Sequence, residues 1–193
     1  MCGRYQFSMD QSQELILIAQ EIDPRYGAHA WTPGEIRPSV LAPVLVASNG
    51  TAQPELQSWG YKLLGPLVIN ARAESVEEKP LFHESVRSRR CAIPSAGFYE
   101  WDREKRKYQF KLPGEDALYM AGLYDVRDGK SCYCILTTAA NESVSQIHHR
   151  MPLVLRKEHI LPWLEQTELA SEFLHINPPL LEKFSAEDQL RLW

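Results

Sequence analysis

The sequence predicts an α+β fold, in which one domain over residues 1–193 is built around a curved, mostly antiparallel and barrel-like β-sheet with flanking helices. Three observations support this prediction. Short segments rich in β-branched and aromatic residues follow one another at hairpin spacing through the middle of the chain. Turn-forming pairs separate several of them, namely Asn49-Gly50, Pro113-Gly114 and Asp128-Gly129. Segments with helical apolar spacing lie toward both ends.

The first expected element is a helix near the N-terminus. Several residues that favour the N-cap position lie between residues 8 and 13, ahead of the segment ELILIAQEI. The apolar spacing of that segment predicts a helix over residues 14–22 that ends before Pro24. The Pro and Gly content of residues 27–43 predicts irregular chain after it.

The expected strands share β-prone composition and an alternation of apolar and polar residues. They span residues 43–47, 55–61, 91–94, 97–102, 107–112, 117–125, 132–138 and 151–155. The remaining segments are expected to be helical or irregular. Residues 67–75 begin like a strand and pass into a helix near residues 74–90, Asn141 caps a helical turn that leads to Ile147, and the chain after residue 157 is helical twice.

Composition sets limits on compartment and partners. No run approaches the roughly 20 apolar residues of a spanning helix, and no secretory signal opens the chain, so we expect a cytoplasmic protein without membrane contact. Its four cysteines should then be reduced. Cys132 and Cys134 lack the CxxC spacing of zinc sites, so we expect neither a metal nor another cofactor. A net charge of −4 argues against a protein that coats duplex DNA, but it allows a short basic groove.

Cys2 follows the initiator methionine directly. Chain ends are usually mobile, so this is a poor position for a structural thiol. Once Met1 is removed, Cys2 carries a free α-amine and a thiol on adjacent carbons, and no internal cysteine offers that pair of nucleophiles. The position therefore indicates that Cys2 has a chemical role as a nucleophile and not a structural one.

Other polar residues stand where an apolar strand residue is expected. Asn70 and Arg72 end an apolar run, and Glu100 lies between two aromatic residues. His148 comes shortly before a strand. Each has a simple alternative role at the surface or in a loop. A carboxyl group between large apolar rings, however, has a raised pKa, and a histidine titrates near neutral pH, so both suit proton transfer.

Several motifs in this chain resemble the SOS response-associated peptidase (SRAP) family, in family order over residues 1–155. They are CGRY after Met1, WGY at 59–61, INARAES at 69–75, RRCAIPSAGFYEW at 89–101, MAGLYD at 120–125, TTAAN at 137–141 and IHHRMPLVL at 147–155. The resemblance implies the SRAP fold and a protein that senses abasic sites in single-stranded DNA and attaches to them covalently. It implies single-stranded DNA with abasic sites and replication-fork proteins as partners, and we expect a monomer.

The resemblance also implies a role for each matching residue. Cys2 is the crosslinking residue, Asn70 contacts the abasic sugar and Cys2, Glu100 is the catalytic glutamate, and His148 assists ring opening and reversal. DNA contacts fall on Arg4, Arg72, Arg150 and Trp59. For Trp59, the alternative role is packing in the core, which we favour over stacking on a base.

The chemistry agrees with these roles. An abasic deoxyribose equilibrates with an open-chain aldehyde, and an α-amine with a pKa of about 7.7–8.0 is partly neutral at pH 7 and can attack it. Glu100 can move the protons needed to expel water and leave an imine. The Cys2 thiol then closes on the imine carbon to give a five-membered thiazolidine, helped by its tether to the same residue.

Three segments depart from the family pattern. The loop after Trp59-Gly60 reads YKLLGP, so it is shortened and lacks the tryptophan that the family carries there; Ala30 replaces an asparagine before Pro33, and the chain after residue 155 is short. Preference for a particular DNA junction is therefore not carried over.

Three alternatives stay open. An N-terminal-nucleophile amidohydrolase also begins Cys-Gly after Met1 removal, although its glycine-rich motifs are not found here. A thiol peptidase that removes its own N-terminal residue, or a lyase-like activity, could accompany crosslinking. A non-covalent single-stranded DNA-binding module is the third alternative.

Overall fold

The structure, a computed structural model, describes residues 2–10, 12–27 and 29–185. Its α-helices are α1 (Gln13–Tyr26), α2 (His83–Ser88), α3 (Lys157–Glu165) and α4 (Ala170–Leu174), with 3-10 turns at η1 (Ala73–Ser75) and η2 (Thr167–Leu169). Its first strands are β1 (Arg4–Phe7), β2 (Gly34–Ile36), β3 (Leu41–Ser48), β4 (Thr51–Trp59), β5 (Asn70–Arg72), β6 (Arg90–Ser95) and β7 (Gly97–Trp101). The later strands are β8 (Lys107–Lys111), β9 (Leu118–Arg127), β10 (Lys130–Ala139), β11 (Arg150–Pro152), β12 (Val154–Leu155) and β13 (Glu182–Ser185).

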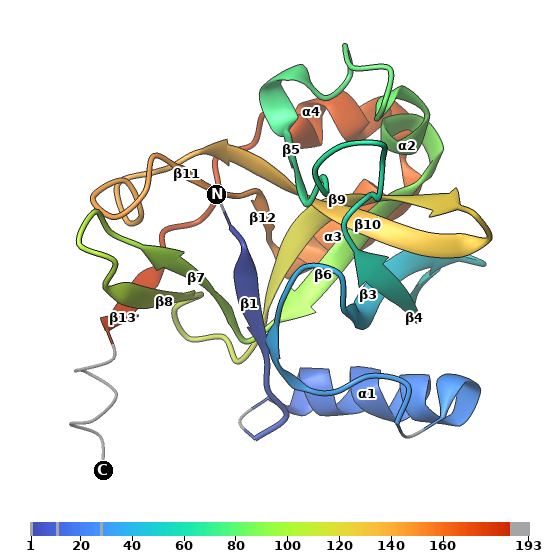
Figure 1. Cartoon of the computed structure of the whole chain (residues 1–193), viewed down its shortest axis with the longest axis horizontal. Helices are drawn as coiled ribbons and strands as arrows, with labels where there is room; N and C mark the ends of the chain where they lie inside the picture. Colours follow the sequence, from blue (N-terminus) through green and yellow to red (C-terminus); the bar gives the residue numbers. More distant parts are fainter. Residues whose placement is uncertain (1, 11, 28, 186–193) are drawn as a thin grey trace.

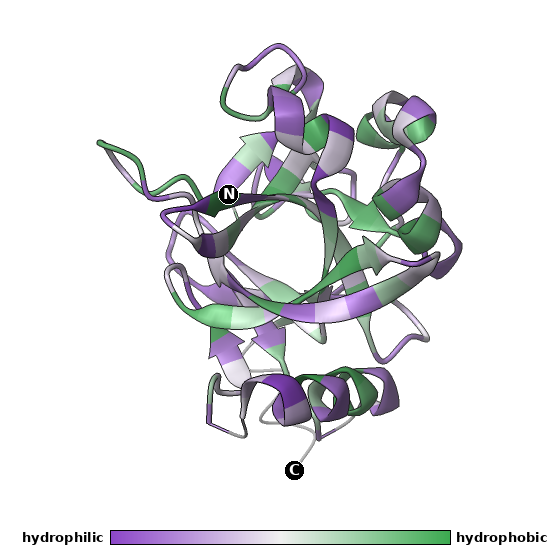
Figure 2. Cartoon of the chain, turned by 90° about the vertical axis from the view of Figure 1, so that its right-hand side faces the viewer, coloured by the Kyte–Doolittle hydropathy of each residue, from purple (hydrophilic) through white to green (hydrophobic). Residues whose placement is uncertain are grey.

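Five strands close a β-barrel. In the order β10-β4-β3-β6-β9, each strand pairs with the next, and β9 pairs back with β10. Figure 2 shows this ring of strands. Every pair in it is antiparallel except β10 with β4. The predicted α+β fold with a curved, mostly antiparallel, barrel-like sheet is therefore confirmed.

A second sheet, which we call the small sheet, has the strand order β13-β8-β7-β1-β2 and is antiparallel throughout. It lies beside the barrel, to the left in Figure 1. Arg4 pairs with Tyr99 and Tyr5 pairs with Phe98, so each pair shares one face. Tyr5 and Phe98 are fully buried, whereas Arg4 and Tyr99 are partly exposed on the other face.

Tyr5 fastens the small sheet to the barrel. Its hydroxyl lies 2.7 Å from that of Tyr133 on β10, and its ring packs on Trp59 of β4 with centroids 5.3 Å apart. Tyr133 and Trp59 are themselves stacked, 6.3 Å apart at an interplanar angle of 6°. Such aromatic pairs contribute about 0.5–1.5 kcal/mol each beyond area burial, so β1 is held firmly. The N-terminal residues are thereby carried to the junction of the two sheets.

The predicted N-terminal helix exists, but its end is wrong. Ser12 is the N-cap, and its Oγ accepts from the Leu15 amide at 3.2 Å. The helix continues through Pro24 to Tyr26 and ends at Gly27, whose positive φ of 90° suits a glycine. Pro24 lies in the last turn, where it removes a single backbone donor.

One further helical expectation is wrong. The expected helix near residues 74–90 is reduced to η1 and α2, because Pro80 separates them and disfavours helical backbone at the residue before it. The expected helical turn after Asn141 is confirmed: Asn141 Oδ1 accepts from the Ser143 amide at 3.1 Å, and the Asn141 carbonyl accepts from the Ser145 amide at 2.9 Å. The two helical segments expected after residue 157 are confirmed as α3 and α4.

The strand expectations are confirmed with three differences. The expected strand at residues 151–155 is split at Leu153, whose N–H binds Leu136 of β10 and whose carbonyl binds Ala121 of β9. β2 lies within a segment expected to be irregular, and β13 was not expected. No helix among the described residues is long and apolar enough to cross a membrane.

Candidate active site

Cys2 is fixed in place, unlike most residues near a chain end. It is fully buried, and its thiol donates to the main-chain oxygen of Arg4 at 3.6 Å. The side-chain amide of Asn70 donates from Nδ2 to the Cys2 carbonyl at 2.9 Å. Burial raises the pKa of the Cys2 thiol, and the Glu100 carboxylate raises it further. The thiol is therefore protonated in this environment.

Asn70 is supplied by β5, which pairs in parallel with β10 so that Asn70 lies opposite Ile135. One end of its amide holds Cys2. Its Oδ1 is buried and has no hydrogen-bond partner among the described residues. A buried acceptor without a partner is costly, so this oxygen is available to a donor on a ligand.

Glu100 is the fourth of the five residues of β7, and the simple alternative that it points to solvent is wrong. Its side chain is 5% exposed. Strand alternation turns it away from the face that carries Tyr99 and Trp101 and onto the buried face that carries Phe98. Desolvation raises the pKa of the Glu100 carboxyl, and the nearby His148 partly offsets that rise. A carboxyl in this environment can both donate and accept a proton near neutral pH.

His148 stands next to Glu100. Its Nδ1 lies 4.0 Å from Glu100 Oε1 and 3.0 Å from both the main-chain N and O of Arg150. Its ring stacks on that of His149, with centroids 4.4 Å apart. His148 lowers the pKa of the exposed His149 by charge repulsion. The contacts with Arg150 hold the His148 ring beside the carboxyl group of Glu100.

The structure therefore brings together four of the residues predicted from the sequence. A thiol that adjoins the chain's N-terminus, an amide, a carboxyl group with a raised pKa and an imidazole converge from the segment before β1, from β5, from β7 and from the segment before β11. Such a set can position an electrophile, attack it and transfer protons. All four cysteines are free thiols in the structure. Among the described residues no group of three or more His, Cys, Asp or Glu is placed to hold a metal.

The three arginines predicted to contact DNA differ in their exposure and in their ion pairs within the protein. Arg72 is exposed. Arg4 is 38% exposed in its side chain and forms an ion pair with Glu35 at 2.7 Å. Arg150 is engaged within the protein: its guanidinium makes two bonds to Glu74, at 2.6 and 2.9 Å, and its side chain is 12% exposed. DNA contacts at these arginines stay predictions, and for Arg150 the contact would compete with Glu74.

Trp59 requires a correction. Its side chain is fully buried, and its Nε1 donates to the Ile69 carbonyl at 3.0 Å. A tryptophan enclosed between Tyr5 and Tyr133 cannot stack on a DNA base in this structure. The alternative role in core packing is the one that the structure supports.

One pocket adjoins His148. It has a volume of about 630 Å³, and its lining includes Trp101, Arg103, Arg106 and Tyr108. These residues were not predicted as part of a site. The available signal was that Trp101 alternates with Glu100 along one strand, which places an aromatic ring on the outer face directly beside a buried acid.

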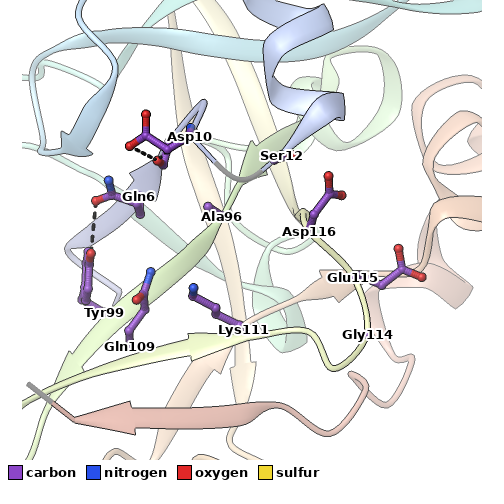
Figure 3. A pocket seen from close by; sticks show the side chains of 11 residues that line it. Gln6, Asp10, Ser12, Ala96, Tyr99, Gln109, Lys111, Gly114, Glu115 and Asp116 are labelled. Carbon is purple, nitrogen blue, oxygen red and sulfur yellow. Dashed lines mark hydrogen bonds between the residues drawn. The ribbon is translucent and has the colours of Figure 1, made fainter. Parts of the chain in front are cut away.

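A second pocket, of about 530 Å³, lies on the outer face of the small sheet (Figure 3). Tyr99 there donates to Gln6 at 3.1 Å, and Gln109 and Lys111 come from the neighbouring strand. Three carboxylates, those of Asp10, Glu115 and Asp116, line its other side. The negative charge of these three side chains disfavours a phosphate at that side of the pocket.

Comparison with known proteins gives consistent findings. A family model described as SOS response associated peptidase (SRAP) matches residues 1–191. The abasic site processing protein YobE of Bacillus subtilis is 36% identical to this chain, over 97% of the chain and 91% of YobE. The abasic site processing protein YedK of Escherichia coli is 27% identical over 86% of the chain and 80% of YedK. A solved structure of a Bacteroides thetaiotaomicron protein has a TM-score of 0.76 and 22% identity, covering 98% of this chain and 94% of that one, which supports the fold.

Proposed function

The chain belongs to the SOS response associated peptidase family, and on that premise we propose that it processes abasic sites in DNA by bonding to them covalently through Cys2. One observation carries the proposal. The residue that would supply both nucleophiles is held by Asn70 and lies beside a buried carboxyl group with a raised pKa. Single-stranded DNA is the expected substrate, since the open-chain aldehyde must reach a site that is buried between two sheets.

The first steps make a carbon–nitrogen bond. Removal of Met1 frees the α-amine of Cys2, whose lone pair attacks the aldehyde carbon of the opened deoxyribose. The nitrogen loses a proton and the oxygen gains one, which gives a carbinolamine. Protonated Glu100 then donates to the hydroxyl, water leaves, and the protonated imine that remains loses its nitrogen proton to solvent to give the imine. His148, at 4.0 Å from Glu100, can return a proton to that carboxylate.

The last step closes a ring. The Cys2 thiol adds through sulfur to the imine carbon, and its proton passes to the nitrogen, with Glu100 as the carrier. Aldehyde, amine and thiol thus become a thiazolidine and one water. Because sulfur and nitrogen belong to one residue, the closure is intramolecular and gains from proximity. The buried Oδ1 of Asn70 can accept from a sugar hydroxyl during these steps.

The test uses a single-stranded oligonucleotide with one abasic site. Protein and DNA are mixed, and the products are examined on denaturing gels and by intact mass. We expect a heat-stable adduct with the wild type, none with undamaged DNA and none with Cys2→Ala. Cys132→Ala is the matched control, since it removes another buried thiol and should leave the adduct unchanged. Absence of an adduct from wild-type protein whose mass shows Met1 removed would refute the mechanism. Assays for glutaminase activity and for plain DNA binding would then separate the two remaining alternatives.

We also propose that the same groups can remove the N-terminal residue, which is hydrolysis of the Met1–Cys2 peptide bond with the uptake of one water. The support is the Cys2 thiol next to Glu100 together with the peptidase named in the family description. Wild-type and Glu100→Ala proteins are expressed under the same conditions, and the intact mass of each is measured by mass spectrometry. Retention of Met1 in Glu100→Ala alone supports self-removal, whereas loss of Met1 from both assigns the step to a host aminopeptidase.

A further inference from the structure

A cluster of opposite charges lies on the outer face of the small sheet, around Glu35 of β2. Three cationic side chains converge on its carboxylate. Arg4 Nη1 lies 2.7 Å from Oε1, Arg37 Nη2 lies 3.1 Å from the same oxygen, and the Lys107 ammonium binds Oε2. We call Arg4, Arg37 and Lys107 the basic triad. They come from β1, from the residue after β2 and from β8, so the fold brings them together across four adjacent strands.

The charges in this cluster do not balance. Glu35 is the one carboxylate that forms an ion pair with the basic triad among the described residues, so three positive charges face one negative charge. The hydrogen bond from Lys107 is the main cause that lowers the pKa of Glu35, which keeps it ionised. A site with two formal positive charges in excess favours binding of an anion, either in addition to the Glu35 carboxylate or in its place.

The basic triad is next to the proposed active site. The main-chain oxygen of Arg4 accepts from the Cys2 thiol, and Arg4 pairs with Tyr99, the residue before Glu100. Successive side chains of a strand point to opposite faces of the sheet. In β1 and β7 the buried side chains therefore face the proposed active site, and the residues that alternate with them lie on the face that carries the basic triad. DNA whose abasic sugar reaches Cys2 therefore brings a neighbouring phosphodiester close to Arg4.

Aromatic rings complete the same face. Lys107 Nζ lies 3.8 Å from the centroid of the Tyr99 ring, and the Arg4 guanidinium lies 5.6 Å from that of Trp101. Both aromatic residues are partly exposed. Cationic groups beside accessible aromatic rings are the combination that binds a single strand through its phosphates and bases.

We propose that Glu35 is a built-in competitor for a DNA phosphodiester: it holds the basic triad together in the free protein and gives it up to the backbone next to the abasic site. This inference rests on the proposed function for the position of the DNA. The exchange is feasible because the four side chains are between 22% and 61% exposed, so their ion pairs are weak and screened. A Glu35 carboxylate left beside a bound phosphate would repel it, so Glu35 limits affinity.

Binding to a fluorescent single-stranded oligonucleotide, measured by anisotropy over a range of salt concentrations, tests this role. All proteins carry Cys2→Ala, so that binding stays non-covalent. Glu35→Gln should bind about three- to tenfold more tightly at low salt, since the ion pairs that DNA must displace are gone. The slope of log K against log[salt] should steepen by about 0.7, which corresponds to one more neutralised phosphate on a single strand. Glu21→Gln, on the exposed side of α1, makes the same charge change and should alter neither quantity.

A second variant guards against indirect effects. Arg37→Gln added to Glu35→Gln should return the salt slope to that of the parent, because one cation is lost again. Circular dichroism and a thermal melt establish that each variant is folded. Equal slopes for Glu35→Gln and Glu21→Gln would overturn the proposal. Weaker binding by Glu35→Gln would also overturn it, since Glu35 would then be a positioning residue for Arg4.

Failure of this inference differs from failure of the proposed function. The adduct assay uses Cys2 and the abasic aldehyde, whereas the binding assay uses neither. An adduct from the wild type with no effect of Glu35→Gln on binding refutes the competitor role alone. A steeper slope without any adduct leaves a nucleic-acid site that Glu35 regulates and refutes the covalent mechanism.

Discussion

Replacement of Glu100 by glutamine should slow adduct formation at neutral pH by about 10²–10⁴-fold, the usual contribution of a positioned general acid or base. Glutamine has nearly the same shape, and the side chain at this position is 5% exposed, so the change removes a titratable proton with little change in packing. In activation free energy the loss corresponds to about 3–5 kcal/mol. Single-turnover rates, from gels of the abasic oligonucleotide at protein excess, measure it.

The pH dependence makes this prediction sharper. Attack needs a neutral Cys2 amine, and loss of water needs protonated Glu100. With the pKa of Glu100 raised by desolvation, the wild-type rate should rise with pH, level off, and fall above the amine pKa of about 8 as the protonated carboxyl becomes rarer. Glu100→Gln should keep the rise and lose the fall. A Glu100→Gln protein with wild-type rates, or with an unchanged fall at high pH, would refute the role of Glu100 as the proton donor.

Stability supplies the control for that experiment. A carboxyl group whose pKa is raised on folding binds more protons in the folded chain than in the unfolded chain. Wild-type protein should therefore lose stability as pH rises from the ordinary Glu pKa of 4.5 through the raised value. Glu100→Gln lacks that loss, so its free energy of unfolding in urea should equal or exceed that of the wild type at pH 8. A slow variant that is also unstable would indicate misfolding instead of lost proton transfer.

Three other changes have separate expected outcomes. Asn70→Ala removes the bond to the Cys2 carbonyl, worth about 0.5–1.5 kcal/mol, so single-turnover adduct rates should fall by up to about tenfold while the melting temperature changes little. Arg150→Met breaks the two bonds to Glu74 in a side chain that is 12% exposed, and urea unfolding should show a loss of about 1–3 kcal/mol; an unchanged midpoint would refute the structural role. Trp59→Phe removes one of the two donors to the Ile69 carbonyl, which keeps its bond from the Ile135 amide, and leaves a gap in the core, so it should cost about 1–3 kcal/mol in unfolding while leaving the salt dependence of DNA binding as it was. A change in that salt dependence would instead restore a DNA contact for Trp59.

Local rules predicted the barrel strands well. Asn49 and Gly50 both have positive φ, 51° and 77°, as the turn of a tight hairpin requires, and they join β3 to β4 where the sequence indicated. The parallel pairing of β10 with β4 was beyond those rules, because it joins segments more than 70 residues apart and depends on barrel closure. β13 was missed because a short edge strand gains its order from β8 and has little apolar pattern of its own.

The sequence predicted which residues form the proposed active site, but not how deeply their side chains are buried or which residues surround them. The family motifs identified Cys2 and Glu100. Strand alternation showed that the Glu100 side chain points to one face of its strand, but not whether that face is buried. Which face is buried depends on the docking of the small sheet against the barrel through Tyr5. Glu35 could not be predicted, since a lone acid in a segment expected to be irregular shows no partner until distant strands are brought beside it.

The burial of Cys2 limits the time during which a host enzyme can remove Met1 from the nascent chain. A peptidase needs its substrate extended, whereas β1 lies between β2 and β7 in the folded protein, with Cys2 enclosed just ahead of it. β7 ends at Trp101, so the partner that closes over β1 is synthesised long after the N-terminus. At about 5–20 residues per second, a ribosome leaves roughly 5–20 s for a host enzyme to trim Met1. For a chain still untrimmed after that interval, the proposed self-removal through its own thiol and carboxyl group is the route by which the amine would be exposed.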